Sequence, residues 1–200
     1  KRRMERERER LRCQFEKRQN LLMAGSILLI LAGILLDQFT KHLAVVYLKG
    51  SQPVSLIPGV LELRYLENRG AAFGMMQGAK VFFLIITPVI LAAVIYALIK
   101  MPSDGKFRVL HILLDCVAVG AVGNMIDRIR LDYVVDFIYI SLIDFPIFNV
   151  ADMFVSIACV VGAILILFSN KYKDEDFRFL SFKQKQSIPK EEDSPENEKE

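Results

Sequence analysis

The sequence has few of the residue types that build disulfide frameworks or zinc sites. Its 200 residues include three cysteines and two histidines. Cys13, Cys116 and Cys159 lack metal-like spacing, and their odd number argues against a disulfide framework. Free cysteines are usually buried like small apolar residues, so we expect these thiols to fill space. His42 and His111 fall at different depths of the predicted helices, which argues against a histidine-based zinc site.

Several sequence signatures of function are also missing. The chain has no P-loop and no GxGxxG motif, and no serine lies in a nucleophile-elbow pattern. No internal repeat is visible. The basic residues of the N-terminal arm alternate with glutamates, so we expect no nucleic-acid partner. These absences argue against the common nucleotide-binding and serine-hydrolase classes.

Long apolar stretches are present instead. Apolar residues make up 53% of the chain and its mean hydropathy is +0.34, which argues against an ordinary soluble domain. A bilayer core is spanned by about 20 apolar residues. Four stretches of suitable length therefore predict an α-helical integral membrane protein with four transmembrane helices. They are Leu21–Leu36, extended through Asp37 to about Tyr47, and Val81–Ile99, Val109–Ile126 and Phe145–Phe168.

The distribution of basic residues predicts the orientation of these helices. Nine Lys or Arg precede Leu21, three lie between 100 and 108, and more follow Phe168. The other two connections are poorer in basic residues, so the positive-inside rule places both termini in the cytoplasm. We therefore expect a charged arm over 1–20, a membrane domain over 21–168 with outer loops 49–80 and 127–144, and a largely disordered charged tail over 169–200.

Two segments outside the predicted helices resemble strands. "VLELRYLE" alternates apolar and polar residues, and "YVVDFIYI" is rich in β-branched and aromatic residues. The stretch "IPGV" before the first of them is a turn signal. We therefore predict a small β element on the extracytoplasmic side of the membrane.

Polar residues of three predicted helices converge on one depth of the bilayer. Asp37 lies 16 residues after Leu21, and Asp152 lies 16 residues before Phe168, which is about 24 Å in each case at a rise of about 1.5 Å per residue. The residues at this outer depth are Asp37, Asn124, Asp127, Asn149 and Asp152. Asp115 lies closer to the cytoplasm, where it either pairs with His111 or bonds to the fourth helix.

The acids of "VVDFIYISLIDFPIFNVAD" differ in context. Asp144, just before Pro146, suits a cap or surface position. Asp152 enters an apolar run and Asp136 is a lone acid among apolar residues, so both need another explanation. Two carboxylates held together share a proton and can perform acid–base catalysis. A cation site and polar contacts between helices are the alternatives that these residues leave open.

Five motifs, in order, resemble the bacterial lipoprotein signal peptidases, or signal peptidase II, a family of membrane aspartyl peptidases with four helices. They are "DQFTK" at 37–41, "NRGAAFG" at 68–74, "GAVGNMIDR" at 120–128, "VVDF" at 134–137 and "FNVAD" at 148–152. Each motif alone is weak, but five in this order are specific. The resemblance covers roughly residues 21–168, and the two charged tails fall outside it.

The resemblance implies a role for individual residues. It places the catalytic dyad on Asp136 and Asp152, with Asp127 as the nearest rival to Asp136. The residues that it implies for substrate binding or support are Asp37, Lys41, Asn68, Gly70, Asn124, Asp127, Arg128 and Asn149. Two positions depart from the family pattern: Val119 replaces a frequent Gly, and Met153 replaces a small or hydroxyl residue. Neither departure removes an acid.

The resemblance also implies an activity. The family removes the signal peptide from diacylglyceryl-modified prolipoproteins by cutting before the lipidated cysteine, without metal or cofactor, and globomycin-type cyclic peptides inhibit it. We therefore expect a peptidase of the bacterial cytoplasmic membrane whose site lies near the outer face. Two alternatives remain open: a cation-binding or transport protein, and a structural membrane module with an inactive site.

Overall fold

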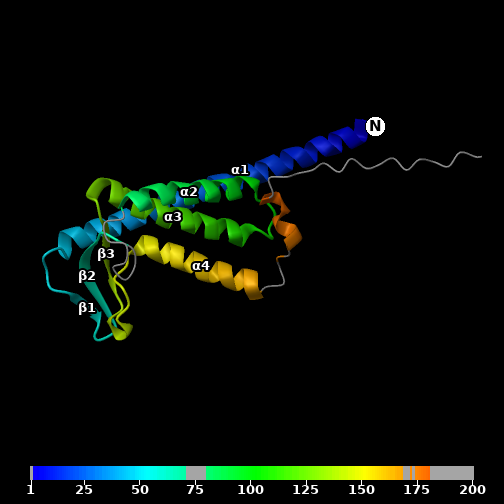
Figure 1. The fold of residues 1–200 in the computed structure, drawn as a ribbon. Helices are drawn as coiled ribbons and strands as arrows, with labels where there is room; N and C mark the ends of the chain where they lie inside the picture. Colours follow the sequence, from blue (N-terminus) through cyan, green and yellow to red (C-terminus); the bar gives the residue numbers. More distant parts are fainter. Residues whose placement is uncertain (1, 71–79, 169–171, 173, 181–200) are drawn as a thin grey trace, which may run out of the picture.

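In the computed structural model, which describes residues 2–70, 80–168, 172 and 174–180, four long helices lie side by side and a small sheet covers one end of them (Figure 1). All four helices are long and apolar enough to cross a membrane, which confirms the predicted fold class. The helices are α1 (Arg2–Tyr47), α2 (Lys80–Lys100), α3 (Arg108–Leu131) and α4 (Val150–Phe168). The strands are β1 (Val54–Ile57), β2 (Leu61–Asn68) and β3 (Val134–Tyr139), and two short 3₁₀ helices are η2 (Ser141–Ile143) and η3 (Asp174–Leu180).

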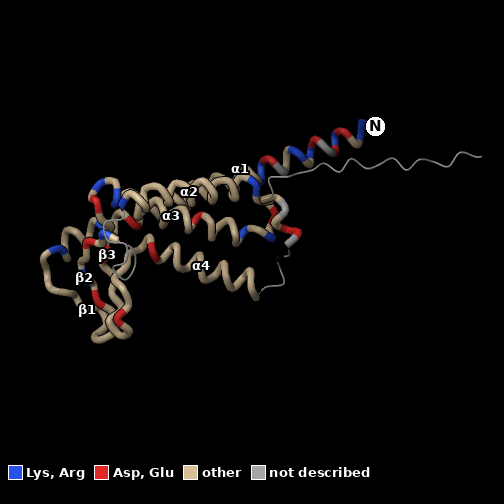
Figure 2. Tube along the Cα trace, in the orientation of Figure 1, with Lys and Arg blue, Asp and Glu red and all other residues tan. Residues whose placement is uncertain are grey.

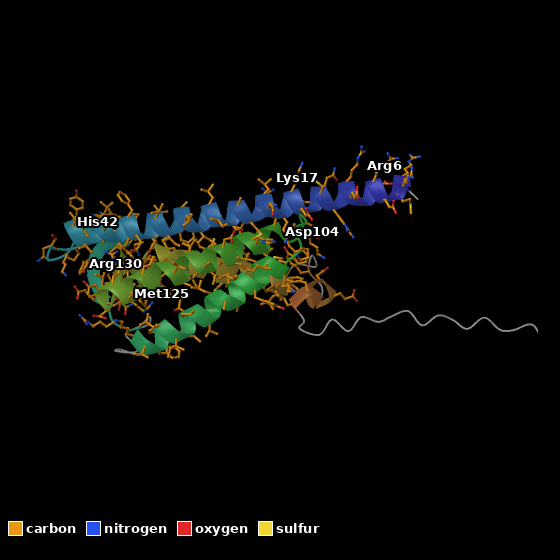
Figure 3. The ribbon with its side chains drawn as sticks, turned by 90° about the horizontal axis from the view of Figure 1, so that it is seen from above. Arg6, Lys17, His42, Asp104, Met125 and Arg130 are labelled. Carbon is orange, nitrogen blue, oxygen red and sulfur yellow. The ribbon has the colours of Figure 1, made fainter. Side chains whose placement is uncertain are left out.

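Three helix boundaries differ from those expected from the apolar stretches. The charged arm and the first span form one helix, α1, which extends well beyond the other helices (Figures 1 and 3). α3 continues past Ile126 to Leu131, so Asp127 and Arg128 lie on a helix rather than in an outer loop. α4 begins at Val150 rather than Phe145. The expected disordered tail over 169–200 falls mostly outside the described residues.

α3 is the central helix and contacts the other three. Glycines allow its close approach to α1 and α4 near the end that carries the sheet. A Cβ atom on Gly120 would lie 2.5 Å from the Ala151 carbonyl oxygen, and one on Gly123 would lie 2.6 Å from Asp37 Oδ2. A larger residue at either position would push the helices apart where the polar residues of the three helices meet.

The three strands form an antiparallel sheet in the order β1-β2-β3. Its register places Asp136 of β3 opposite Leu66 and Val134 opposite Asn68. Ala44 and Leu48 at the end of α1 pack with Val135 and Phe137 in a buried apolar cluster. The sheet is therefore anchored to the helices through alternate residues of β3, while Asp136, between them on the chain, faces the other way.

A second apolar cluster lies at the opposite end of the helices. It joins Met101 and Phe107, before α3, to Leu110 and Tyr172, with Phe177 and Phe179 of η3 packed against it. An ion pair of 2.5 Å between Lys106 Nζ and Asp176 Oδ2 closes this contact. Charged residues gather at the two ends of the molecule and leave the helical middle largely uncharged (Figure 2).

Candidate active site

A cavity of about 640 Å³ lies between α2, α3, α4 and β3. One end is polar and the other is lined by apolar residues of the three helices. The polar lining residues are Asn68, Asn124, Arg128, Asp136 and Asp152, and the apolar ones include Ile90, Val117, Val155 and Ile157. An elongated apolar segment could thus lie in the cavity with one end against two carboxyl groups.

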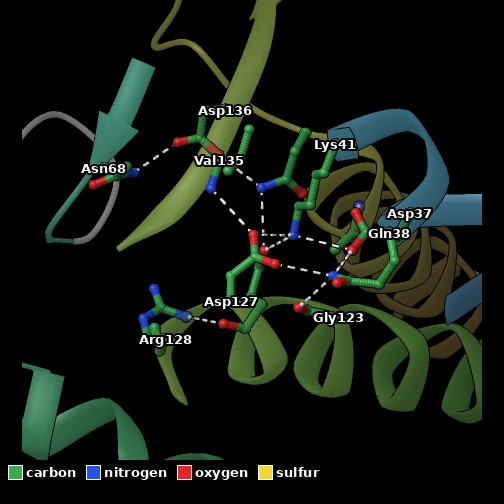
Figure 4. A network of polar contacts seen from close by, with 12 residues as sticks. Asp37, Gln38, Lys41, Asn68, Gly123, Asp127, Arg128, Val135 and Asp136 are labelled. Atoms are coloured by element: carbon green, nitrogen blue, oxygen red, sulfur yellow. Dashed lines mark hydrogen bonds and ion pairs between the residues drawn. The ribbon is translucent and has the colours of Figure 1, made fainter. Parts of the chain in front are cut away.

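Asp136 is almost completely buried, with 1% of its surface exposed. Asn68 Nδ2 donates to its Oδ2 at 2.8 Å, and Asn149 Nδ2 donates to its Oδ1 at 2.6 Å; the Asn68 bond is visible in Figure 4. Burial, followed by the nearby charge of Asp152, raises the pKa of Asp136 to about 7, although the two amide donors and Lys41 oppose this shift. Asp136 is therefore poised to exchange a proton near neutral pH.

Asp152 lies in the first turn of α4 and receives two donors. Asn124 Nδ2 donates to Oδ1 at 2.7 Å, and the backbone N–H of Asn149 donates to Oδ2 at 3.2 Å. Asn149 Oδ1 accepts in return from the backbone N–H of Asp152 at 3.0 Å, as in a capping box. Because its side chain also donates to Asp136, Asn149 links the two acids directly.

A buried ionic cluster lies behind the acids. Lys41 Nζ is 3.0 Å from Asp37 Oδ2 and 3.0 Å from Asp127 Oδ2 (Figure 4). It also donates to Asn124 Oδ1 at 2.9 Å. All three charged side chains are buried, so each charge depends on the others for compensation. Gln38 Nε2 adds a bond of 3.0 Å to Asp127 Oδ1.

The two carboxylates of this cluster also hold the backbone next to each acid of the cavity. Asp37 Oδ1 accepts from the N–H of Ala151, the residue before Asp152, at 2.9 Å. Asp127 Oδ2 accepts from the N–H of Val135, the residue before Asp136, at 3.1 Å (Figure 4). The cluster therefore fixes where α4 begins and where β3 passes over α3.

Arg128 is a basic residue of the cavity lining. Its guanidinium is 4.3 Å from the centre of the Phe83 ring and donates at 3.4 Å to the carbonyl oxygens of Gly70 and Asn124. The Gly70 N–H donates in turn to Asn68 Oδ1 at 3.0 Å. The rest of the "NRGAAFG" motif, 71–74, lies outside the described residues.

All ten site residues predicted from the sequence lie around this cavity or in the ionic cluster behind it. Gln38 and Phe83 were missed. Gln38 could have been found because it is polar at the same helical depth as Asp37, whereas Phe83 resembles any other apolar residue of its helix. Asp144 is exposed, as expected, and accepts from Tyr139 Oη at 2.5 Å.

Asp115 takes neither of the two expected partners. His111 Nε2 lies 3.4 Å from the Pro102 carbonyl oxygen and forms no salt bridge with Asp115 among the described residues, although its charge still acts on that carboxyl group. Asp115 forms a side-chain hydrogen bond with Ser26 of α1. One carboxyl oxygen of Asp115 has no hydrogen-bond partner within the described part of the chain. Asp115 therefore lies apart from the cavity and its acids.

Comparisons with known proteins agree with this geometry. A family profile described as signal peptidase (SPase) II matches residues 29–169. Proteins named lipoprotein signal peptidase from Streptococcus thermophilus and Caldanaerobacter subterraneus are 43% and 44% identical over 142 and 146 residues. These alignments cover 71% and 72% of this chain and 91% and 96% of the two relatives.

A solved structure of a bacterial membrane enzyme, determined by the in meso method, is also similar. It has a TM-score of 0.67 and 34% sequence identity, and the match covers 76% of this chain and 93% of that one. The solved chain thus has the same fold over nearly its whole length. Together with the sequence matches, this likeness identifies the chain as a member of the signal peptidase II family of peptidases.

Proposed function

We propose that this protein removes the signal peptide from diacylglyceryl-modified prolipoproteins by cutting before the lipidated cysteine, with Asp136 and Asp152 as its catalytic pair. The observation that supports the pair most directly is that both carboxyl groups line one cavity and share Asn149 as a hydrogen-bond partner. Family membership supports the substrate class. Asp127 is a weaker candidate because it does not line the cavity and its carboxylate forms an ion pair with Lys41.

In the proposed reaction the two acids have different roles. Asp152 removes a proton from a water molecule as the water oxygen bonds to the scissile carbonyl carbon. Asp136, whose raised pKa of about 7 lets it hold a proton, donates that proton to the amide nitrogen as the C–N bond breaks. The products are a new carboxyl terminus on the signal peptide and a free amine on the lipidated cysteine.

The remaining site residues support this pair. Asn68, Asn124 and Asn149 hold the carboxyl groups. Asp37 and Asp127 hold the backbone beside them, and Lys41 forms ion pairs with both of these carboxylates. Arg128 and Gly70 also line the cavity and are joined by a hydrogen bond, so they can contact the substrate backbone. The apolar end of the cavity, between α2 and α4, accommodates the signal peptide, whose own apolar segment lies in the bilayer.

The proposal includes an orientation in the membrane. Arg6 and Lys17 lie toward one end of the molecule, and His42 and Arg130 lie at the other (Figure 3). The sequence has nine Lys or Arg before Leu21, most of them in the part of α1 that carries Arg6 and Lys17. By the positive-inside rule the end with Lys17 and both termini lie in the cytoplasm. The acid pair then lies near the outer face of the bacterial cytoplasmic membrane, at the level where a lipid anchor holds its cysteine.

Purified protein tests the proposed function directly. We expect it to cut a diacylglyceryl-modified precursor immediately before the lipidated cysteine and to leave the unmodified precursor uncut. A globomycin-type cyclic peptide should block the cut, and a chelator should not slow it. Equal cutting of the unmodified precursor, or a reaction stopped by the chelator, would contradict the proposal.

A further inference from the structure

Lys41 uses its whole hydrogen-bonding capacity in the cluster behind the acids. An ammonium group has three N–H donors and no acceptor. Its three close partners are Asp37 Oδ2, Asp127 Oδ2 and Asn124 Oδ1, at 3.0, 3.0 and 2.9 Å. Two of these partners compensate its charge. The third, Asn124, is a neutral side chain that also contacts Asp152.

The bond from Lys41 determines which way the Asn124 amide points. An asparagine amide has an acceptor on one side and a donor on the other, and either orientation can occupy the same space. Because the ammonium can only donate, Asn124 must turn its oxygen toward Lys41. Its nitrogen is then directed at Asp152 Oδ1, at 2.7 Å. A flipped amide would present N–H to the ammonium and an oxygen lone pair to the carboxylate.

Asn149 reinforces this orientation without determining it alone. Its Nδ2 is 3.1 Å from Asn124 Oδ1 and also donates to Asp136. The charged groups around Asn124 are Asp37 and Lys41 from α1, Asp127 and Arg128 from α3, Asp136 from β3 and Asp152 from α4. Among these charged groups of the described residues, Lys41 alone donates a hydrogen bond to the Asn124 side-chain oxygen.

We propose that Lys41 is a positioning residue of the peptidase reaction, which acts by orienting the Asn124 amide so that its N–H is aimed at Asp152. This inference rests on the proposed function, because it concerns the acid that activates the water. Lys41 is 3% exposed and does not line the cavity, so it has no contact with the substrate space. Its loss should therefore slow the chemical step and leave substrate binding largely unchanged.

The first test compares two Lys→Met substitutions, one within α1 and one two residues after its end. Lys41→Met removes the buried ammonium, while Lys49→Met removes an exposed partner of Glu67 at 2.9 Å. Losing a hydrogen bond to a charged group in the transition state lowers the rate by roughly 10–100-fold. We expect Lys41→Met to lower kcat by this factor with KM within about 3-fold of wild type, and Lys49→Met to change neither.

A double-substitution cycle separates positioning from general support. If Lys41 acts through Asn124, adding Lys41→Met to Asn124→Ala should lower kcat by less than about 3-fold more, because the amide to be oriented is already gone. If Lys41 acts independently of Asn124, the two losses multiply. Unchanged kcat in Lys41→Met, a change confined to KM, or multiplying losses would each overturn the proposal.

Removal of Lys41 also leaves two buried carboxylates without their cation, which endangers folding. The same cycle is therefore also run in an Asp127→Asn background. Together, Lys41→Met and Asp127→Asn remove one charge of each sign from the buried cluster. Failure of Lys41→Met with Asp127→Asn to fold would assign Lys41 to folding and overturn the positioning role. A wild-type chain that does not cut the lipid-modified precursor would instead contradict the proposed function itself.

Discussion

Asp136 and Asp144 lie eight residues apart, yet they differ in burial, in hydrogen-bond partners and in their position relative to the cavity. Asp136 is buried, receives two amide donors and lines the cavity. Asp144 is exposed and contacts the hydroxyl of Tyr139. Desolvation favours the protonated form of a carboxyl group, and solvent favours the ionised form. Burial therefore lets Asp136 hold a proton near neutral pH.

This difference predicts the effect of pH on the rate. As the pH rises through about 7, Asp136 loses its proton and can no longer donate to the leaving nitrogen, so kcat should fall. The Asn68 donor stabilises the ionised form and lowers the pKa, so Asn68→Ala should raise it and move the basic limb of the pH–kcat profile to higher pH. A limb that stays in place or moves to lower pH would contradict this role of Asp136.

Individual contacts could be predicted from the sequence only along one helix. Asp37 and Lys41 are four residues apart on α1, a spacing that favours an ion pair. The contact of Lys41 with Asp127 joins two helices, and helical depth predicted only that Asp37, one turn before Lys41, lies at a similar level to Asp127. Asp136 lies on a strand outside the helices, where depth arguments do not apply, so the family resemblance alone selected it.

At the scale of elements, the spacing between α1, α3 and α4 depends on small residues. Gly123 faces both neighbouring helices: an added Cβ would lie 2.6 Å from Asp37 Oδ2 and 3.2 Å from Ala151 Cβ. The carboxylate that would have to move is the one that holds the Ala151 N–H. Helix spacing and site geometry are thus coupled at this glycine.

We therefore expect Gly123→Ala to lower both stability and activity. Overpacking of a tight site costs about 1–3 kcal/mol of folding free energy, and the shifted Asp37 releases the start of α4. Gly162→Ala is the matched control, because its Cβ would meet Leu113 Cδ1 at an ordinary 3.7 Å. Thermal unfolding in detergent and precursor cleavage measure the two effects. Equal behaviour of both variants would contradict the coupling.

The presence of the four helices could be predicted from the sequence, but their end residues were predicted less well. Hydropathy marks only where apolar residues begin and end. A helix continues for as long as its backbone N–H and C=O groups form helical hydrogen bonds. α3 extends through the polar Asp127 and Arg128 because Lys41, the Val135 N–H and the Phe83 ring satisfy them. The apolar residues 145–148 are not helical, because Phe148 pairs with Ile138 in a β-bridge.

At the scale of the whole molecule, two charged ends enclose an apolar middle (Figure 2). The sheet and the acid pair lie at one end, and the aromatic cluster around Phe107 lies at the other. Composition and charge were enough to predict this division. They could not predict how β2 and β3 place Asn68 and Asp136 over the helices, because that arrangement depends on pairing between distant segments.

The orientation predicts which cysteine labels from which side. Cys13 is exposed on the charged arm of α1 and Ser55 is exposed on β1, at the other end. In a chain whose Cys116 and Cys159 are replaced by serine, we expect Cys13 to react with a membrane-impermeant thiol reagent only after permeabilisation. A Ser55→Cys variant that also lacks Cys13 should react in intact cells. The reverse pattern would contradict cytoplasmic termini.

The central claim is that Asp136 and Asp152 together perform the cleavage. Its most direct measurement is the rate at which purified Asp136→Asn and Asp152→Asn variants cut a lipid-modified precursor, beside wild type and Asp144→Asn. Asparagine keeps the size of each side chain but cannot exchange the proton. We predict at least a roughly 100-fold loss of kcat for either site variant and a near wild-type rate for Asp144→Asn. Near-normal cutting by a folded Asp136→Asn or Asp152→Asn variant would contradict the account.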